Sequence, residues 1–261
     1  MSASSDAKLL AGRLFEAQRQ RQPIALLTNE RQISEREAYD IQWALVQEHL
    51  VRGGRIVGKK TGLTSKAKQV QMSTNEPLFA YLIDHTMLND GAQIERSALI
   101  HPRVECEIAF VMGQQLCGPG VTGDQVLNAT QHVLPALEVI DSRYNNFRFT
   151  LPDVIADQAS AAYVVLGGSV RSPRGLDLRL LGMLLQINGD MAAAGSGAAV
   201  LGHPADSVAW LVNKMAEMKA GGLEEGDVVM AGGLTEAFPL ESGDHFRAEF
   251  DHLGPVSLKC V

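Results

Sequence analysis

Two glutamates separated by one residue stand in a segment, His101–Val111, that is apolar after Arg103 apart from them, and their spacing suits metal chemistry. In a β-strand alternate side chains share a face, so Glu105 and Glu107 point to one side while the other side is apolar: Val104, Cys106, Ile108 and Phe110. Carboxylates on one face lie about 7 Å apart along the strand, close enough to reach one ion, and they repel each other unless something neutralises them. A strand face turned to solvent is the alternative explanation.

A third carboxylate, Glu138, lies in a nearly continuous apolar run, Val133–Asp141. Such runs are typical of strands covered on both faces. A carboxylate buried there needs a cation, a proton or an arginine partner such as Arg103 or Arg143. Three carboxylates from two strands favour a hard divalent cation, Mg²⁺ or Mn²⁺, which binds oxygen ligands and keeps positions open for water or substrate. No His/Cys spacing in the sequence favours zinc instead.

The segment Gly58–Lys66 is predicted as a strand, a loop and the start of a helix. Gly62 permits a sharp turn, and backbone N–H groups at the helix start could bind an anion there: those of Leu63, Thr64 and Ser65. The glycine spacing of a P-loop is missing, so a substrate carboxylate fits better than a phosphate. We expect Lys60 to point inward with Gly62, where it can stabilise negative charge or move a proton, and Lys59 to be solvated.

Two further segments offer candidate substrate contacts. Asp157–Ser160 precedes a predicted strand, so Gln158 and Ser160 can present polar groups either to a ligand or to a turn. In Met230–Thr235, the glycine pair before Leu234 permits close approach of the backbone to a ligand or to a neighbouring strand. Thr235 at the end of this segment is the candidate contact there.

The elements that must position these residues begin with helical patterns and continue with strand patterns. Capping residues at Ser4–Asp6 and at Ser34–Glu37 precede apolar residues at helical spacing. Further helices are predicted over 65–72, 121–132 and 204–215, and strands over 55–58, 101–111, 134–141, 162–166, 227–232, 245–250 and 256–261. This order favours an α+β fold over an alternating doubly wound sheet. We expect an N-terminal helical portion over 1–75 and a β-rich catalytic domain over 76–261.

Composition excludes several classes of protein. The chain of 261 residues is 46% hydrophobic and 20% charged, as is usual for soluble globular proteins, and its net charge of −7 argues against a nucleic-acid partner. No apolar run approaches the ~20 residues that span a bilayer, and the first residues lack a secretory signal, so no membrane partner is expected. Three cysteines without C-x-x-C spacing favour reduced, buried thiols in a cytoplasmic protein: Cys106, Cys117 and Cys260.

Several segments together resemble the fumarylacetoacetate hydrolase superfamily, in its branch of hydratases and decarboxylases from meta-cleavage pathways of aromatic catabolism. They run in family order: Gly58–Ala67, Pro102–Phe110, Leu134–Arg143, Ala156–Ser160 and Gly195–Pro204. The resemblance implies a mixed β-roll or barrel-like core with an N-terminal helical portion. It also implies Mg²⁺ held by three glutamates, an active-site lysine and loop contacts, at these positions: Glu105, Glu107 and Glu138; Lys60; Leu63 to Ser65 and Ser160.

Within this branch, Leu78 favours one of two activities. The hydratases carry an aspartate after the proline of their Gln/Glu-Pro-Asp motif, but this chain has Leu78 there, and an alkyl side chain cannot activate water. The segment Asp141–Phe149 also resembles the decarboxylases. The resemblance therefore implies Mg²⁺-dependent decarboxylation of a 2-oxo dicarboxylic acid, 2-oxo-3-hexenedioate, with hydration of 2-hydroxypentadienoate as the alternative. Leu78 and Phe79 are expected to line an apolar part of the pocket.

Some residues depart from the decarboxylase pattern: Gln158 replaces an asparagine, Ala80 replaces a glycine, and Lys66 is more typical of hydratases. A different interpretation makes the chain a non-catalytic partner that stabilises a pathway hydratase, because decarboxylases of the family associate with their hydratases. The intact carboxylates and Lys60 argue against it. We expect a homo-oligomer that also associates with the pathway hydratase.

Overall fold

The computed structural model describes residues 4–261, apart from the side chain of Gln71. Its helices are α1 (Ser5–Gln20), α2 (Glu35–Leu50), α3 (Lys66–Gln71), α4 (Gly123–Ala129), α5 (Leu151–Ala156) and α6 (Pro204–Glu217). Its strands are β1 (Ile56–Gly62), β2 (Leu78–Ile83), β3 (Met87–Asn89), β4 (Ala92–Ile94), β5 (Arg103–Met112), β6 (Thr130–Ile140), β7 (Ala161–Leu166), β8 (Gly182–Ile187), β9 (Asp190–Ser196), β10 (Val228–Gly233), β11 (Phe238–Pro239), β12 (His245–Phe250) and β13 (Gly254–Cys260). The predicted α+β class is confirmed.

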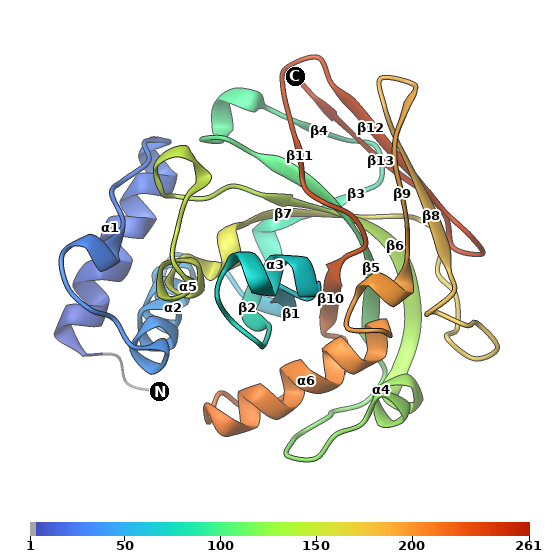
Figure 1. The fold of residues 1–261 in the computed structure, drawn as a ribbon, viewed down its shortest axis with the longest axis horizontal. Coiled ribbons are helices and arrows are strands. Elements are labelled where there is room, and N and C mark those ends of the chain that lie inside the picture. Colours follow the sequence, from blue (N-terminus) through green and yellow to red (C-terminus); the bar gives the residue numbers. More distant parts are fainter. Residues whose placement is uncertain (1–3) are drawn as a thin grey trace.

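The larger sheet has eight strands in the order β2-β1-β10-β5-β6-β7-β3, with β11 paired to β5. It curls into a half-barrel whose middle strands are β5 and β6 (Figure 1). In this antiparallel pair Glu105 lies opposite Glu138, and Glu107 lies opposite Ala136. Paired residues of adjacent strands face the same side, so the register brings the three predicted carboxylates to one face.

The second sheet has five strands in the order β4-β13-β12-β8-β9. Its strands β12 and β13 pack against β6 of the larger sheet. Residues of β12 alternate between buried and exposed, which turns Phe246, Ala248 and Phe250 inward. This packing supports one side of the curl and leaves the inner surface near β5 and β10 open to a cavity.

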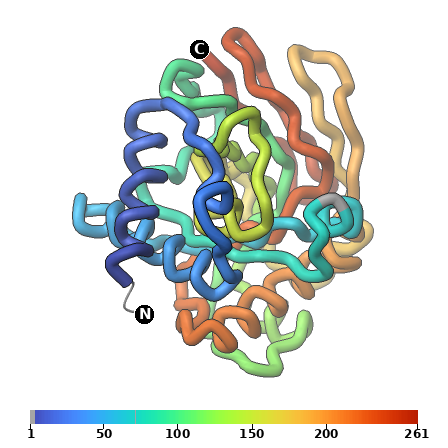
Figure 2. The backbone as a smooth tube through the Cα atoms, turned by 60° about the vertical axis from the view of Figure 1, so that its left-hand side comes forward, coloured from blue at the N-terminus to red at the C-terminus, as the bar shows by residue number. Residues whose placement is uncertain are grey.

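The N-terminal helices form a layer at one side of the larger sheet, where α1 packs on α2 and α2 packs on α5 (Figure 2). The predicted helix starts are confirmed, because Ser4 Oγ accepts a hydrogen bond from the N–H of Ala7 (3.1 Å) and Ser34 Oγ from that of Glu37 (3.2 Å). Helix α6 packs on β1 and β10. The helices therefore hold the strands that carry Lys60 and the glycine pair.

Two predicted element boundaries were wrong. Strand β1 continues through Gly62 instead of ending at Gly58, because it pairs with β2 as far as Gly62 and with β10 as far as Lys60. The helix predicted over 121–132 ends at Ala129, where Thr130 begins β6. Six further strands were not predicted: β2, β3, β4, β8, β9 and β11.

The prediction that Lys59 is solvated was also wrong. Lys59 is 5% exposed and forms an ion pair with Asp227, which is 7% exposed. Strand alternation places Lys59 and Thr61 on one face, and Thr61 accepts a hydrogen bond from Ser207 of α6 (3.0 Å). Lys59 is buried because α6 covers that face, which the local sequence does not show.

Strand β1 lies within residues 1–75 but is an inner strand of the larger sheet, and the division of the chain at residue 75 stays a prediction. Within residues 4–261, no helix has both the length and the apolar character that crossing a membrane requires. The described cysteines are free; Cys106 and Cys260 are buried as predicted, but Cys117 is exposed because it lies in the loop between β5 and α4.

Candidate active site

Three carboxylates converge inside the curl of the larger sheet. One oxygen from each of Glu105, Glu107 and Glu138 lies within 4.8 Å of the others. The side chains are buried, with exposed fractions of 8%, 1% and 1%. The alternative of a solvent-facing strand is therefore wrong for β5.

The arginine alternative for Glu138 is also wrong. Arg143 forms a buried ion pair with Asp157, and Arg103 makes no ion pair with Glu138. Instead, Lys60 Nζ lies 2.5 Å from Glu138 Oε1. Lys60 is 2% exposed and also donates a hydrogen bond to the carbonyl oxygen of Ala159 (3.2 Å).

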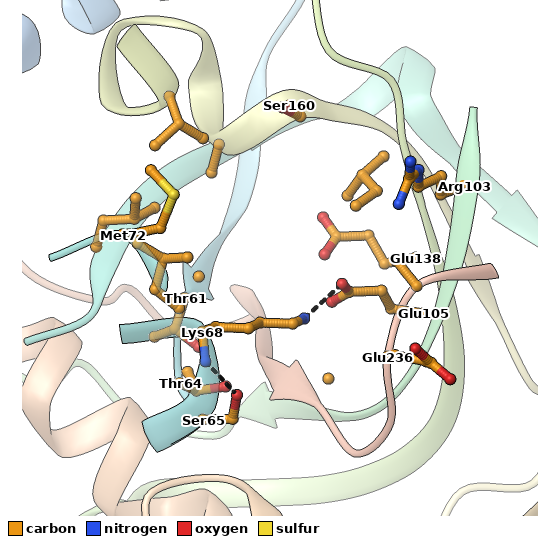
Figure 3. Close-up of a pocket in the computed structure, with 18 of the residues that line it drawn as sticks. Thr61, Thr64, Ser65, Lys68, Met72, Arg103, Glu105, Glu138, Ser160 and Glu236 are labelled. Carbon is orange, nitrogen blue, oxygen red and sulfur yellow. Dashed lines mark hydrogen bonds and ion pairs between the residues drawn. The ribbon is translucent and has the colours of Figure 1, made fainter. Parts of the chain in front are cut away.

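A second lysine, Lys68 of α3, also contacts the cluster, and its side chain points to Glu105 (Figure 3). Its Nζ donates to Glu105 Oε1 at 2.6 Å. Although burial lowers it, the carboxylate of Glu105 raises the pKa of Lys68 overall, so this side chain stays charged. Lys68 was not predicted as a site residue. Its only local signal is its position three residues after the helix cap Ser65, whose Oγ accepts a hydrogen bond from the N–H of Lys68.

The electrostatics of the cluster fit a divalent cation. Burial, reinforced by the neighbouring carboxylates, raises the pKa of Glu107 well above its usual range. Burial also raises the pKa of Glu138, although Lys60 opposes this. Glu107 Oε2 accepts from the N–H of Gly232 (2.7 Å), but no donor among residues 4–261 reaches Glu107 Oε1. Converging buried oxygens with free lone pairs match the ligands that Mg²⁺ and Mn²⁺ prefer.

The glycine pair at the end of β10 leaves room for this cluster. A Cβ at Gly233 would lie 2.7 Å from Glu105 Oε2, and one at Gly232, where φ is +117°, would overlap Thr64. The backbone of this glycine pair therefore closely approaches the carboxylate of Glu105 and the loop after β1, as the sequence led us to expect. Any larger residue would displace one or the other.

A cavity of about 690 Å³ opens above the carboxylates. Most of the predicted site residues line it: Lys60, Gly62, Leu63, Thr64, Ser65, Leu78, Glu105, Glu138, Ser160 and Thr235. Glu107 lies at the buried end of the cluster and is not among the lining residues. Further lining residues were not predicted as part of the site: Lys68, Met72, Arg103, Ile140, Phe147, Arg148, Phe149, Val154 and Glu236 among them.

Two residues lie away from the cavity. Gln158 Oε1 accepts a hydrogen bond from the N–H of Tyr81 in β2 (3.2 Å), so its side chain contacts the sheet. Phe79 stacks on Tyr39 of α2, with ring centroids 4.6 Å apart. Of the predicted apolar pair Leu78 and Phe79, only Leu78 faces the cavity, because the two alternate along β2.

The turn before β7 shapes the wall near Lys60. Three successive residues, Gln158, Ala159 and Ser160, have φ of 53°, 50° and 58°, a left-handed conformation that is uncommon for residues other than glycine and asparagine. The buried pair between Arg143 and Asp157 holds the preceding segment. This backbone aims the carbonyl group of Ala159 at Lys60, so the segment forms a turn and contributes a polar atom to the site.

Comparison with known proteins agrees with this geometry. The sequence profile of the fumarylacetoacetate (FAA) hydrolase C-terminal family matches residues 55–260. A 4-oxalocrotonate decarboxylase of Pseudomonas sp. (strain CF600) is 44% identical over 225 residues, 86% of this chain and 85% of that protein. A 2-hydroxyhexa-2,4-dienoate hydratase of Comamonas testosteroni is 38% identical over 250 residues, 95% and 94% of the two chains.

A solved structure has the same fold over its full length. The 4-oxalocrotonate decarboxylase from Pseudomonas putida G7, complexed with magnesium and adipate, aligns over 100% of both chains with a TM-score of 0.96 and 38% sequence identity. The range that the family profile matches includes the three glutamates and Lys60. The chain belongs to the fumarylacetoacetate hydrolase family.

Proposed function

We propose that this protein is a Mg²⁺- or Mn²⁺-dependent decarboxylase of a 2-oxo dicarboxylic acid, 2-oxo-3-hexenedioate, in the meta-cleavage catabolism of aromatic compounds. The observation that carries the proposal is the convergence of Glu105, Glu107 and Glu138 within 4.8 Å at the end of a cavity. The relatives named 4-oxalocrotonate decarboxylase support the choice of reaction.

The three glutamates would hold the cation. When bound, it supplies Lewis acidity toward the 1-carboxylate and 2-oxo oxygens of the substrate. When all three carboxylates are ionised, as cation ligands must be, they and the two ammonium groups of Lys60 and Lys68 sum to one net negative charge. With a divalent cation included, the same set carries one net positive charge, which favours an anionic substrate over water.

The reaction needs an electron sink and no nucleophile. The bond between C5 and C6 breaks, C6 leaves as CO₂, and the electron pair moves through the C3–C4 double bond to the 2-oxo oxygen. Protonation of that oxygen gives 2-hydroxypenta-2,4-dienoate, which ketonises to 2-oxopent-4-enoate. The buried ammonium of Lys60 can stabilise the developing negative charge and supply the proton.

The cavity wall favours decarboxylation over hydration. Leu78 is 1% exposed and lines the cavity, at the position where the hydratases carry an aspartate. Water addition needs a group that activates water, which an alkyl side chain cannot supply, whereas loss of CO₂ needs no such group. The substrate contacts that we propose are the cavity-lining residues Gly62, Leu63, Thr64, Ser65, Leu78, Ser160 and Thr235, with Gln158 supporting the wall from outside.

A direct comparison of two reactions tests the proposal. Purified protein loaded with Mg²⁺ should release CO₂ from 2-oxo-3-hexenedioate and should hydrate 2-hydroxypenta-2,4-dienoate much more slowly. The variant E107Q, which removes one cation ligand from the same face, should lose CO₂ release. Faster hydration than CO₂ release would make the protein a hydratase, and neither reaction by a metal-binding, folded protein would favour a non-catalytic partner of a hydratase.

We also propose a homo-oligomer that associates with the pathway hydratase in the cytoplasm. Size-exclusion chromatography with light scattering, alone and with the hydratase, measures both associations. A monomeric mass in each run would contradict them.

A further inference from the structure

Arg103 occupies a distinct place on the strand that carries the carboxylates. It is the first residue of β5 and lies on the same face as Glu105 and Glu107, opposite Ile140 of β6. Its side chain lines the cavity. Figure 3 shows Arg103 beside Glu138, on the other side of the cluster from Lys68. Along this face of β5, the buried carboxylates of Glu105 and Glu107 are therefore followed by the partly buried guanidinium of Arg103 at the end of the strand.

The guanidinium is fixed in place but lacks an acidic partner. Its Cζ lies 4.6 Å from the centroid of the Phe147 ring, within the range of cation–π attraction. Within residues 4–261 no carboxylate lies at ion-pairing distance from it, whereas both lysines of the cluster are paired with glutamates. A half-buried guanidinium on an aromatic ring can bind a carboxylate through two parallel hydrogen bonds.

Phe147 is held over Arg103 by an unusual backbone. Asn146 and Phe147 have φ of 59° and 54°, which is a rare conformation for a bulky residue. The segment is anchored to the N-terminal portion, because Asn145 donates to the carbonyl oxygen of Ile24 (3.0 Å) and Ile24 donates to that of Arg143 (2.9 Å). Strain maintained at a cavity wall is typical of positions where the side chain has a function.

The spacing matches a six-carbon diacid. Residues two apart on a strand are separated by about 7 Å, so Arg103 stands one such step from Glu105. In an extended six-carbon chain the terminal carboxyl carbons lie about 6 Å apart, given C–C bonds of about 1.5 Å. A diacid with one end at the three glutamates can thus place its other carboxylate at Arg103.

We propose that Arg103, positioned by Phe147, binds the distal carboxylate of the substrate and selects six-carbon dicarboxylic over monocarboxylic acids. This inference rests on the proposed function, since it assumes that the 2-oxo end binds at the glutamates. Because the guanidinium stabilises the carboxylate before CO₂ leaves, it strengthens substrate binding and does not accelerate the bond cleavage. Arg103 is therefore a specificity-determining residue, and Phe147 is its positioning residue.

Binding of inert probes tests the inference without turnover. Calorimetry with Mn²⁺-loaded protein compares adipate, a six-carbon dicarboxylate, with hexanoate, which has the same length and one carboxylate. Wild-type protein should prefer adipate by about tenfold or more, as expected for a charged bidentate contact. R103M should lose this preference, R103K should keep part of it, and F147L should fall between them.

Two controls separate a specific effect from misfolding. R174M changes an exposed arginine outside the cavity and should keep the wild-type preference. Mn²⁺ affinity should be unchanged in R103M and R103K, which shows that the glutamates are intact. Equal adipate-to-hexanoate ratios in wild type and R103M, with Mn²⁺ binding intact in both, would overturn the inference.

Kinetics distinguish this inference from the proposed function. On 2-oxo-3-hexenedioate, R103M should raise KM by about tenfold or more while kcat stays within a few-fold of wild type. If wild type shows no CO₂ release, the proposed function fails, and the probe-binding result still decides the role of Arg103. If wild type turns over and R103M has the same KM, the proposed function stands and the inference about Arg103 is wrong.

Discussion

Lys60 and Lys68 both contact the acidic cluster, but they differ in attachment and exposure. Lys60 belongs to an inner strand and is almost fully buried, with its Nζ near Glu138 and the carbonyl group of Ala159. The side chain of Lys68 is 30% exposed and extends from a short helix to Glu105. The ammonium group of Lys60, which is buried and has two polar contacts, is suited to stabilising negative charge that develops during the reaction. The more exposed ammonium group of Lys68 mainly changes the net charge of the cluster.

The first prediction concerns Lys60. K60M should lower kcat by about 10²- to 10³-fold, because it removes the cation next to the developing negative charge. Mn²⁺ binding should persist, since the three carboxylates remain. Steady-state CO₂ release and Mn²⁺ calorimetry measure the two effects, and K259M on the exposed part of β13 serves as the control. An unchanged kcat would reduce Lys60 to a structural residue.

The second prediction concerns Lys68. K68M should strengthen Mn²⁺ binding by about fivefold, because a partly exposed ion pair with Glu105 contributes up to about 1 kcal/mol and competes with the cation for that carboxylate. KM for the anionic substrate should rise in the same variant. Calorimetric titration with Mn²⁺ checks the first effect; weaker binding than in wild type would show that Lys68 helps to form the metal site.

At the scale of elements, β1 carries two adjacent lysines to opposite faces. Lys60 faces the cavity, and Lys59 faces α6 and is paired with Asp227. Asp227 also accepts a hydrogen bond from the N–H of Glu224 (2.7 Å). The ion pair between Lys59 and Asp227 therefore joins β1 to the segment that precedes β10.

The third prediction follows from this pair. K59M should lower the free energy of unfolding by about 3–5 kcal/mol, because it leaves the buried carboxylate of Asp227 without its cation. R55M removes the exposed ion pair between Arg55, which precedes β1, and Asp84, and it should lower the free energy of unfolding far less. Urea denaturation measures both. Equal losses in the two variants would show that the buried pair contributes no more than the exposed one.

The fourth prediction concerns the pH dependence of the α1–α2 layer. His49 of α2 packs against Phe15 and His85, and burial, followed by the charge of His85, lowers the pKa of His49 to about 4. The unfolded chain keeps the ordinary histidine pKa of about 6.5. The unfolded state therefore takes up the proton first, so stability should be greatest above pH 6.5 and fall as the pH decreases toward 4.

Denaturation midpoints at pH 7.5, 6 and 5 check this sign. In H49Q the decrease between pH 7.5 and 5 should be smaller than in wild type, whereas H252Q, at an exposed turn, should follow wild type. The interpretation of His49 is wrong if H49Q and wild type lose the same stability over this range.

Elements with a strong periodic pattern were predictable, and those without one were not. Strands β5 and β6 carry alternating or continuous apolar residues, and their register then brings the three carboxylates together. Strand β9 reads Asp-Met-Ala-Ala-Ala-Gly-Ser and lacks the β-branched residues that favour strands. Contacts of distant segments also left no local signal: Lys59 with Asp227, and Lys68 with Glu105, depend on how α6 and α3 pack.

At the scale of the whole molecule, the acidic cluster lies where several strands of the larger sheet and helix α3 meet. Two strands supply the glutamates, β10 supplies the N–H group of Gly232, and β1 and α3 supply the lysines. The three converging carboxylates and the fold class were predictable from the sequence because each rests on a local pattern. The sequence could not predict the cavity wall made by Arg103 and Phe147, which requires the segment after β6 to be anchored at Ile24.

The fifth prediction is that the cation stabilises the whole fold. At a free Mn²⁺ concentration of about 100 times Kd, binding should contribute about 2.7 kcal/mol, and the melting temperature should rise by roughly 5–10 °C for a chain of this size. Differential scanning fluorimetry with Mn²⁺ and then with a chelator measures the shift. E107Q should show little of it; an equal shift in E107Q would place the binding elsewhere.

The carbonyl group of Ala159 has a consequence for how Lys60 is studied. The atom that orients this lysine belongs to the peptide chain, so an alanine scan has no side chain to delete there. Natural variation at 158–160 would then record tolerance of a left-handed turn, with small or amide residues accepted whatever their chemistry and branched ones rejected. A search for the partner of Lys60 among side-chain types would overlook it, although it lies 3.2 Å away.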